Sequence, residues 1–518
     1  MHRRDLLRLL GLSTLAGAAG CSPASSASDV LGLTPRDAGA WAQAPDVDLV
    51  LTAAPGEVAL LPGEPTRVWR FTGERLSGPA DTLTALPDSY LGPVIRLRRG
   101  QRVRIRFVNQ LAEDSIVHWH GLDVPEHADG HPRLAVGAGR DYVYEFTVTN
   151  RAGTYWYHPH PHMRTGAQVY HGLAGLLLVS DPDEDALGLP SGGRELLCVL
   201  QDRLVDSRNQ LLYQGTMMEM MNGVLGDRLL VSGQVQPTRD VDAAWHRVRL
   251  LNGSNARIYK IAWSHDLPMI VIGSDGGLLE RPLVQPTLTL APGQRADLLV
   301  DLTAFAAGTD VRLESVAYPA EAAGGVGMMG GGMGRMGGMG ETAALPQGAA
   351  ARLMTLRVGA TRGDAWAVPA RLPSFDATWA PQPAAPVRRV PLRFQRMQWL
   401  LGDRTFAMED VAADETVRAG STHIWEFINM PNGMGMEAAH PIHIHGRQFR
   451  VLDRRGSDPA NALREGIVDA GWTDTVLVLP GETVRVQVTF TPHPGLYLYH
   501  CHILEHEDMG MMRNFRVV

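Results

Sequence analysis

The chain has 518 residues, a formal net charge of −7, 45% hydrophobic residues and 20% charged residues. At roughly 100–200 residues per domain, this length predicts about three domains, each able to bury a core. The near balance of charges argues against nucleic acid as the main partner, because phosphate binding requires a concentrated basic surface. The 56 glycines and 34 prolines, with little helical periodicity, favour an all-β protein with many turns.

Residues 1–28 have the features of an export signal, which we exclude from the fold. Arg3-Arg4 precede an apolar stretch over 6–19, and the arginine pair resembles a twin-arginine signal, the route for proteins exported already folded. Residues 18–21 (AAGC) also resemble a lipoprotein cleavage box, so lipidation of Cys21 and ordinary cleavage downstream are both open. We expect a periplasmic or otherwise extracytoplasmic protein without a membrane span.

Cysteine is too rare for a disulfide framework, with three residues in the whole chain. Cys21 ends the leader, and Cys501 lies between two histidines. Cys198 lies in the apolar run 196–200, which predicts a buried, unreactive thiol.

Three segments of the chain share one strand template. Residues 100–109 (GQRVRIRFVN) and 420–429 (GSTHIWEFIN) have the same spacing from glycine to asparagine, and 245–252 is a weaker copy without the glycine. Each copy alternates apolar and other residues with period two, which is typical of a strand with one buried face. A second phrase, a glycine turn followed by a strand, begins at Gly139, Gly293 and Gly481.

These repeats predict three consecutive β-sandwich domains, over roughly 40–182, 190–358 and 385–518. A third phrase, which ends in His-x-His, occurs only in the first and last copies, at 153–160 and 495–502. The middle domain lacks this phrase, and we interpret it as a spacer that sets the geometry of its neighbours.

Four His-x-His pairs predict a metal cluster. They are His118/His120, His158/His160, His443/His445 and His500/His502. Residues i and i+2 of a strand share a face, so each pair directs two imidazoles to one point. One pair is compatible with a surface strand, but four pairs, two in each end domain, are not. Eight imidazoles suffice for three metal ions at an interface between the first and third domains, and neither domain alone supplies enough ligands.

Cys501 predicts a second metal site, because its sulfur points away from the face that carries the two flanking imidazoles. The nearby groups that complete this site are His440, His506 and Met511. Two imidazoles, one thiolate and a weak axial methionine are the composition of a blue-copper electron-transfer site. Zinc also accepts cysteine and histidine, but zinc explains neither the Cys/His interleaving nor the eight-histidine cluster.

Four segments together resemble the copper signatures of multicopper oxidases: HWHG from 118, HPHPH from 158, HPIHIHG from 440 and HCHILEHEDMGM from 500. The resemblance covers essentially the mature chain. It implies three consecutive cupredoxin-like Greek-key β-sandwich domains that hold four coppers. It further implies a type 1 copper at His440, Cys501, His506 and Met511, a type 2 copper at His118 and His443, and a type 3 pair at His120, His158, His160, His445, His500 and His502.

The same resemblance implies the reaction. A reducing substrate gives electrons singly to the type 1 copper, Cys501 connects this copper to the cluster, and dioxygen is reduced there to two waters. The resemblance also implies a role for Asp129 and Glu507, because they match the positions of proton-relay carboxylates in bacterial relatives. The alternatives are that Asp129 is a turn residue before Gly130 and that Glu507 only holds a ligand by a hydrogen bond.

Methionines indicate the reducing substrate. Residues 324–340 contain ten glycines and five methionines, which are Met328, Met329, Met333, Met336 and Met339. A second group, Met430, Met434 and Met436 with Glu437, directly precedes His440. Thioethers suit cuprous ion, and the pattern resembles bacterial copper-tolerance oxidases, although the acid and methionine are displaced relative to that pattern. The alternative for the Gly/Met segment is a linker without a binding role.

Three functions remain open from the sequence: a cuprous oxidase in copper tolerance, a laccase-like oxidase of phenols and aromatic amines, and a non-enzymatic copper-sequestering protein. The complete ligand set disfavours the third, because storage does not require it. We expect a monomer whose partners are dioxygen and either cuprous ion or a small phenolic or aromatic amine reductant. It would contact a membrane only through a lipidated Cys21. We interpret His127, His131 and His171 as loop or surface residues.

Overall fold

The computed structural model describes residues 44–326, 344–372, 379–429, 436–456 and 458–518, and the statements below concern these parts of the chain. The predicted leader with Cys21 lies outside them, and so do the predicted copper-binding residues Met328, Met329, Met333, Met336, Met339 and Met434. The described residues belong to one compact unit. Within the described ranges, every helix is too short or too polar to cross a membrane.

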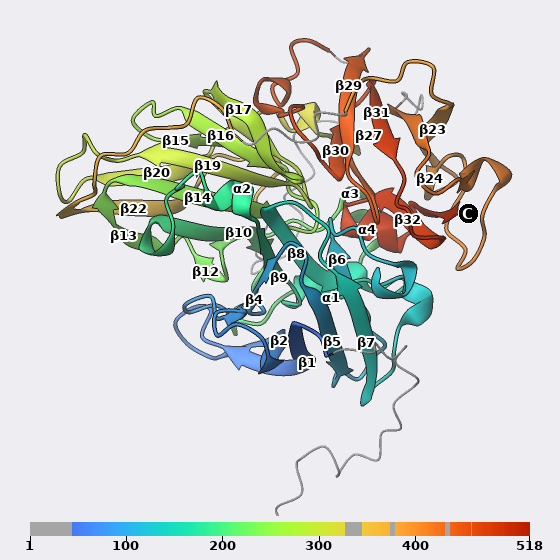
Figure 1. Cartoon of the computed structure of the whole chain (residues 1–518), viewed down its shortest axis with the longest axis horizontal. Coiled ribbons are helices and arrows are strands. Elements are labelled where there is room, and N and C mark those ends of the chain that lie inside the picture. Colours follow the sequence, from blue (N-terminus) through green and yellow to red (C-terminus); the bar gives the residue numbers. More distant parts are fainter. Residues whose placement is uncertain (1–43, 327–343, 373–378, 430–435, 457) are drawn as a thin grey trace, which may run out of the picture. The chain divides into compact units, whose positions relative to one another are not determined.

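Strands dominate the described chain and form three successive β-sandwiches, which confirms the predicted all-β fold (Figure 1). The first sandwich has one sheet of β2 (Thr66–Ser77), β1 (Val47–Val58), β5 (Arg102–Asn109) and β7 (Arg140–Thr147). Its other sheet contains β3 (Leu83–Thr84), β4 (Val94–Arg98), β9 (Gly175–Ser180), β8 (Gly153–Pro159) and β6 (Val117–His120).

The middle sandwich is coloured green to yellow in Figure 1. Its larger sheet contains β12 (Gln234–Val235), β11 (Arg228–Val231), β10 (Glu195–Arg203), β14 (Trp245–Asn252), β19 (Arg295–Asp301), β16 (Met269–Ser274) and β17 (Gly277–Gln285). The smaller sheet contains β13 (Thr238–Ala243), β22 (Ala351–Arg362), β20 (Asp310–Ser315), β15 (Tyr259–Trp263) and β18 (Leu288–Leu290).

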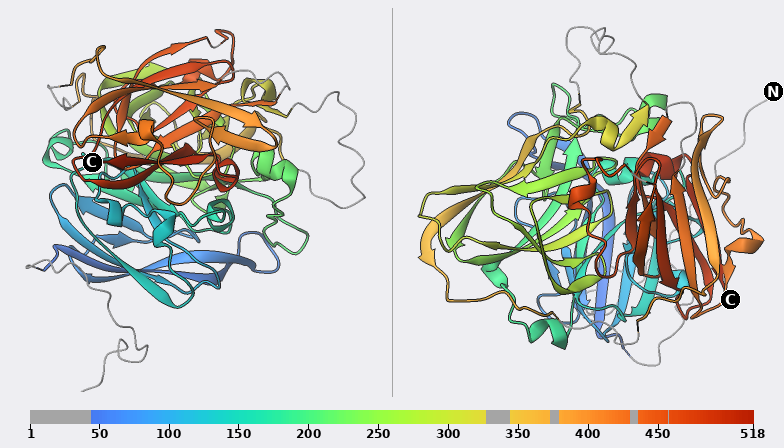
Figure 2. Two further views of the ribbon diagram at one scale, coloured as in Figure 1. Left: turned by 90° about the vertical axis from the view of Figure 1, so that its right-hand side faces the viewer. Right: turned by 90° about the horizontal axis from the view of Figure 1, so that it is seen from above.

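The last sandwich, in orange and red, is seen from two further directions in Figure 2. One sheet contains β24 (Gln398–Leu401), β23 (Val387–Gln395), β26 (Thr422–Asn429), β31 (Thr483–Thr489) and β29 (Phe449–Arg455). The other contains β25 (Thr416–Val417), β33 (Met512–Val517), β32 (Gly495–Cys501), β28 (His440–Ile444) and β30 (Thr475–Val478). A separate two-stranded sheet joins β21 (Gly324–Val326) to β27 (Met436–Ala438), and the described α-helices are α1 (Thr165–Tyr170), α2 (Pro182–Asp185), α3 (Met217–Asn222) and α4 (Leu504–Asp508).

The repeated phrases occupy the same place in each sandwich. The first phrase pairs with the second as antiparallel neighbours: β5 with β7, β14 with β19, and β26 with β31. The asparagine that ends each copy is buried, and its side-chain amide donates to backbone carbonyls of the loop that follows or of other strands, at Asn109, Asn252 and Asn429. The repeat therefore fixes both a strand pair and the loop at its end.

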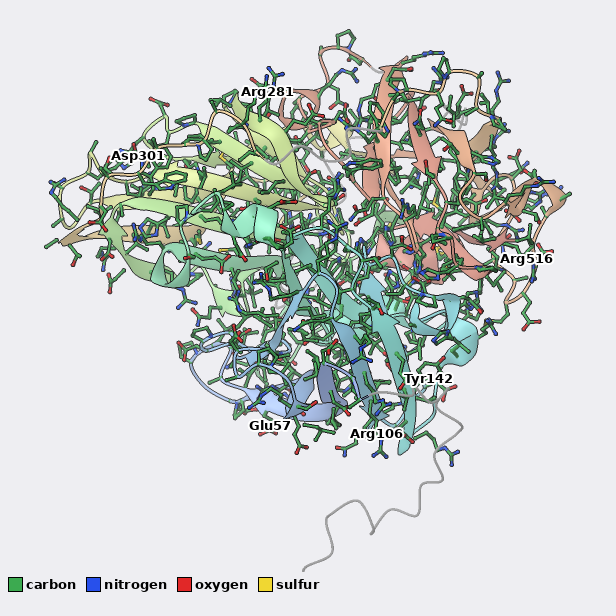
Figure 3. All side chains as sticks on the ribbon, in the orientation of Figure 1. Glu57, Arg106, Tyr142, Arg281, Asp301 and Arg516 are labelled. Carbon is green, nitrogen blue, oxygen red and sulfur yellow. The ribbon has the colours of Figure 1, made fainter. Side chains whose placement is uncertain are left out.

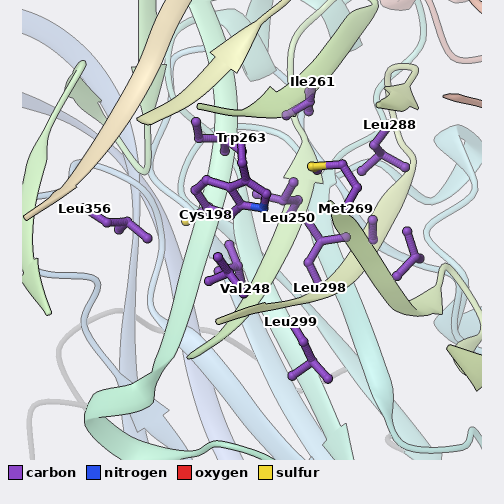
Figure 4. Packing of buried hydrophobic residues seen from close by; sticks show 14 of the residues in the cluster. Cys198, Val248, Leu250, Ile261, Trp263, Met269, Leu288, Leu298, Leu299 and Leu356 are labelled. Atoms are coloured by element: carbon purple, nitrogen blue, oxygen red, sulfur yellow. The ribbon is translucent and has the colours of Figure 1, made fainter. Parts of the chain in front are cut away.

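Period-two alternation produces the cores. On β5, Val103, Ile105 and Phe107 are fully buried, while the arginines between them are partly exposed. In the middle sandwich, strands of both sheets contribute to one apolar cluster, and Figure 4 shows part of it, with Cys198 among the residues drawn. Burial raises the pKa of Cys198 to about 12, which agrees with the predicted unreactive thiol. Charged side chains such as Arg281 and Arg516 are exposed (Figure 3).

Candidate metal centres

Strand register brings the histidine pairs together. In the first sandwich, β6 and β8 are antiparallel, and His118 lies opposite His158. In the last sandwich, β28 and β32 are antiparallel, and His443 lies opposite His500. Because residues two apart on a strand share a face, each strand pair presents a patch of imidazoles, as the sequence predicted.

The two patches face each other where the first and last sandwiches meet. The rings of His118 and His445 stack with centroids 3.7 Å apart, and those of His120 and His443 also stack at 3.7 Å. All eight imidazoles are buried. The Nε2 atoms of His445 and His500 are 3.1 Å apart, and those of His118 and His443 are 3.4 Å apart.

The proton positions on these rings fit a cluster that binds cations. Four Nδ1 atoms lie 2.6–3.0 Å from backbone carbonyl oxygens, to which they can only donate: His118 to Asp129, His158 to Pro159, His443 to Asp474, and His500 to Cys501. Each Nε2 of these neutral rings therefore carries a lone pair. The lone pairs of His118 and His443 face each other at 3.4 Å and repel unless a cation lies between them. Copper, which imidazole suits, fits this donor set.

Burial also favours the neutral, metal-binding form of these rings. Desolvation, with neighbouring imidazoles, holds the pKa of His118, His120, His443 and His445 well below its usual value. Within hydrogen-bonding range, His120 Nδ1 and His158 Nε2 have no protein partner. Unpartnered nitrogens at buried positions are the atoms that a metal would satisfy.

Two buried carboxylates contact the cluster. Asp129 Oδ2 accepts from His445 Nδ1 at 2.8 Å. Glu507 lies on α4, with Oε2 3.1 Å from His500 Nδ1 and Oε1 3.5 Å from His160 Nε2. The structure thus brings both predicted relay residues into direct contact with cluster imidazoles.

A second buried group surrounds Cys501. Its Sγ lies 3.4 Å from His440 Nδ1 and 3.7 Å from His506 Nδ1. The flanking His500 and His502 belong to the cluster on the other face of β32, so the predicted alternation is present. Met511 is fully buried, and its carbonyl accepts from the Cys501 amide at 3.0 Å.

A methionine-rich helix covers this second group. His506 Nε2 donates to the Met221 carbonyl of α3 at 2.9 Å, so its Nδ1 carries the lone pair that faces the thiol. Trp399 Nε1 donates to the same carbonyl at 3.2 Å. On the same helix, Met217 and Met218 are 59% and 52% exposed.

The strand that carries Met436 and Glu437, the predicted methionine and acid before His440, lies beside the first residues of the Gly/Met segment. Strand β27 carries Met436 and Glu437 and pairs with β21, with Glu437 opposite Gly325. The backbone therefore joins the start of the Gly/Met segment to the segment that leads into His440.

Several residues of the site gave no signal in the sequence. Asp474 accepts from His120 Nε2 at 2.9 Å and from Arg295 Nη1 at 2.7 Å, although these residues are far apart in the chain. His131, which we interpreted as a loop or surface residue, is buried, and its Nε2 lies 2.9 Å from Asn514 Oδ1. His131 does lie in a loop, but the surface part of that interpretation was wrong, because the contact with the last sandwich that buries it leaves no mark in the local sequence.

Comparison with known proteins agrees with this geometry. Models of the multicopper oxidase family match residues 70–184 and 381–518. A multicopper oxidase of Staphylococcus aureus is 31% identical over 82% of this chain and 82% of its own length. The chain belongs to the multicopper oxidase family.

Two further relatives support this assignment. The crystal structure of the McoA multicopper oxidase of Aquifex aeolicus has a TM-score of 0.75 and 35% identity, over 92% of this chain and 96% of that one. A laccase of Bacillus subtilis is 29% identical over 87% of this chain and 90% of its own length. The protein is therefore an oxidoreductase that uses copper and dioxygen, built from three cupredoxin-like sandwiches.

Proposed function

We propose that this multicopper oxidase is an exported cuprous oxidase that serves copper tolerance. The proposal rests mainly on one observation, the exposed methionine helix that covers the buried His506. Thioethers bind cuprous ion in preference to hard cations. The paired arginines of the leader support export.

The chain would hold four coppers at two places. His440, Cys501 and His506, with Met511 as a weak axial ligand, would hold the type 1 copper. His118 and His443 would hold the type 2 copper, and the other six cluster histidines would hold the type 3 pair. These coppers supply one-electron oxidation of the substrate and four-electron reduction of dioxygen to two waters.

The protein's own groups orient these ligands and exclude water. Carbonyl oxygens fix the tautomers of four imidazoles, and burial keeps the rings neutral. The Cys501 backbone joins two cluster histidines to the thiol, which gives a covalent path between the two places. We further propose that Asp129 Oδ2 and Glu507 Oε2 carry protons to the cluster, since each contacts a ligand imidazole.

Burial of the type 1 imidazoles favours a small reductant. His440 is 1% exposed and His506 is fully buried, so a bulky aromatic has no direct access to either ring. A cuprous ion at the α3 surface would instead be linked to His506 through the Met221 carbonyl. A laccase-like activity on phenols is the second candidate, favoured by the similarity to the Bacillus subtilis laccase.

The methionines of α3 provide the test. The double substitution Met217→Leu/Met218→Leu removes both thioethers while it conserves volume and helix propensity. We expect kcat/KM for cuprous ion to fall about tenfold, in line with loss of soft ligands, while kcat/KM for a methoxyphenol is unchanged. Met163→Leu is the matched control, because Met163 is 62% exposed but precedes α1 of the first sandwich.

Copper content must be equal in all three proteins before the rates are compared. Unchanged cuprous oxidation in the double variant would contradict the role of α3. A methoxyphenol kcat/KM far above that for cuprous ion in the unmodified protein would favour the laccase-like function.

A further inference from the structure

We propose that Arg295 of the middle sandwich is a positioning residue for the histidine cluster, which it orients through Asp474. This inference rests on the proposed copper cluster. It gives the middle sandwich, which supplies none of the eight cluster histidines, a specific part in building that cluster.

Arg295 uses all of its donors. It is the first residue of β19 and is completely buried. Its Nε donates to the Thr154 carbonyl on β8 of the first sandwich at 2.9 Å. Nη1 and Nη2 also donate to the carbonyls of Gly293 and Asp275 in the middle sandwich, both at 3.0 Å.

The two remaining N–H groups donate to the carboxylate of Asp474 in the last sandwich. Nη1 donates to Oδ1 at 2.7 Å and Nη2 to Oδ2 at 2.6 Å, which is the bidentate arrangement that guanidinium and carboxylate favour. One side chain therefore contacts all three sandwiches, and its five donors are satisfied.

Asp474 in turn orients two cluster imidazoles. Its Oδ1 accepts from His120 Nε2 at 2.9 Å, and its backbone carbonyl accepts from His443 Nδ1 at 2.8 Å. His120 is thereby held with Nδ1 as the free nitrogen, whereas His443 presents Nε2. These two rings stack on each other, so the orientation of one constrains the other.

Asp275, also of the middle sandwich, holds the backbone of the same loop. Its Oδ2 accepts from the Thr473 hydroxyl and from the Thr475 amide, the latter at 3.2 Å. Its Oδ1 accepts from the Arg295 amide at 2.7 Å. The Asp474 carboxylate is thus fixed both by its guanidinium partner and by the loop that carries it.

The physical reason is the cost of an unpaired buried charge. Without the guanidinium, the buried Asp474 carboxylate would lose its cationic partner and the two hydrogen bonds that fix its orientation. A carboxylate that turns away removes the acceptor that fixes the tautomer of His120. Partners of this kind, beyond the ligands themselves, typically change metal affinity or activity by about 10–100-fold.

Arg295→Met tests the inference, with Arg295→Lys as a second variant that keeps the charge but not the planar fork. Arg247→Met is the matched control. Arg247 is also a buried arginine of the middle sandwich, and it donates to Asp297 and Glu184. Neither of these carboxylates is hydrogen-bonded to a histidine of the cluster. Arg247→Met should share the general effect of removing a buried ion pair.

The measurements are copper content and affinity by competition with a chelator, the electron paramagnetic resonance signal of the type 2 copper, and the blue absorption. For Arg295→Met we expect cluster copper affinity to fall about 10–100-fold, with an altered type 2 signal and a retained blue site. Arg295→Lys should give a smaller change in the same direction. The kcat of Arg295→Lys should fall while its KM for the reductant is unchanged, because α3, where the reductant is proposed to bind, is not altered.

Arg247→Met should retain the affinity and the type 2 signal of the unmodified protein. The inference is overturned if both Arg295 variants keep these properties, or if Arg247→Met changes them as much as Arg295→Met does. Failure of the unmodified protein to bind copper at the cluster would instead contradict the proposed function.

Discussion

Substitution of Gly121 by alanine tests how tightly the cluster is packed against its supporting ion pair. Gly121 follows His120 directly and has a φ of +90°, a conformation that side chains disfavour. A Cβ at this position would lie 2.5 Å from Asp474 Oδ2, 2.7 Å from Arg295 Nη2 and 2.9 Å from Tyr155 Cδ1. None of these atoms is the end of a freely moving side chain, because all three residues are buried.

The expected loss of stability in Gly121→Ala has two parts. The left-handed backbone costs roughly 1–2 kcal/mol for alanine. Forcing a methyl group into a packed site costs a further 1–3 kcal/mol, approximately. Gly100 separates these parts, because its φ is +92° but a Cβ there would meet nothing within 4 Å. Gly100→Ala should therefore destabilise the protein by only about 1–2 kcal/mol.

The assay is urea unfolding of the copper-free proteins, followed by copper titration of each. Gly121→Ala should be less stable than Gly100→Ala by about 1–3 kcal/mol, and it alone should lose affinity at the cluster, since displacement of Asp474 disturbs His120. Equal destabilisation of the two variants, with equal copper binding, would refute the packing argument.

Four further substitutions test the site and its surroundings. Cys501→Ser should abolish the blue absorption and the oxidase activity while cluster copper stays bound; persistent blue colour would exclude Cys501 as the type 1 ligand. His443→Ala should remove about one copper per chain and leave the blue site nearly intact, and full copper content would show that it is not a type 2 ligand. Glu507→Gln should slow oxygen reduction while type 1 reduction stays fast, because an amide cannot pass protons; unchanged reoxidation in stopped-flow would refute the relay. Burial opposes ionisation of Glu415, but hydrogen bonds from Arg513 help to lower its pKa from 4.5 to about 2. The ionised carboxylate therefore stabilises the fold above pH 4.5, and this stabilisation is lost as the pH falls towards 2. Glu415→Gln should therefore cost roughly 3 kcal/mol near neutral pH and progressively less below pH 4.5; a cost independent of pH in urea unfolding would contradict this.

The fold and the grouping of the histidines and Cys501 could be predicted from local patterns. Period two along a strand places His500 and His502 on one face and Cys501 on the other, whatever the rest of the chain does. The repeated phrase likewise predicted the strands that became β5, β14 and β26, because each copy alternates apolar and other residues; which strands pair was seen only in the structure. These are properties of neighbouring residues, and one sequence contains them in full.

Tertiary structure alone decided what surrounds those residues. Nothing near Arg295 in the sequence indicates that its guanidinium reaches Thr154 of the first sandwich and Asp474 of the last. Likewise, the Met221 carbonyl contacts His506 only because α3 packs over the last sandwich. Contacts of this kind depend on how three separately patterned sandwiches meet, and a buried polar atom takes whichever partner that packing brings within about 3 Å.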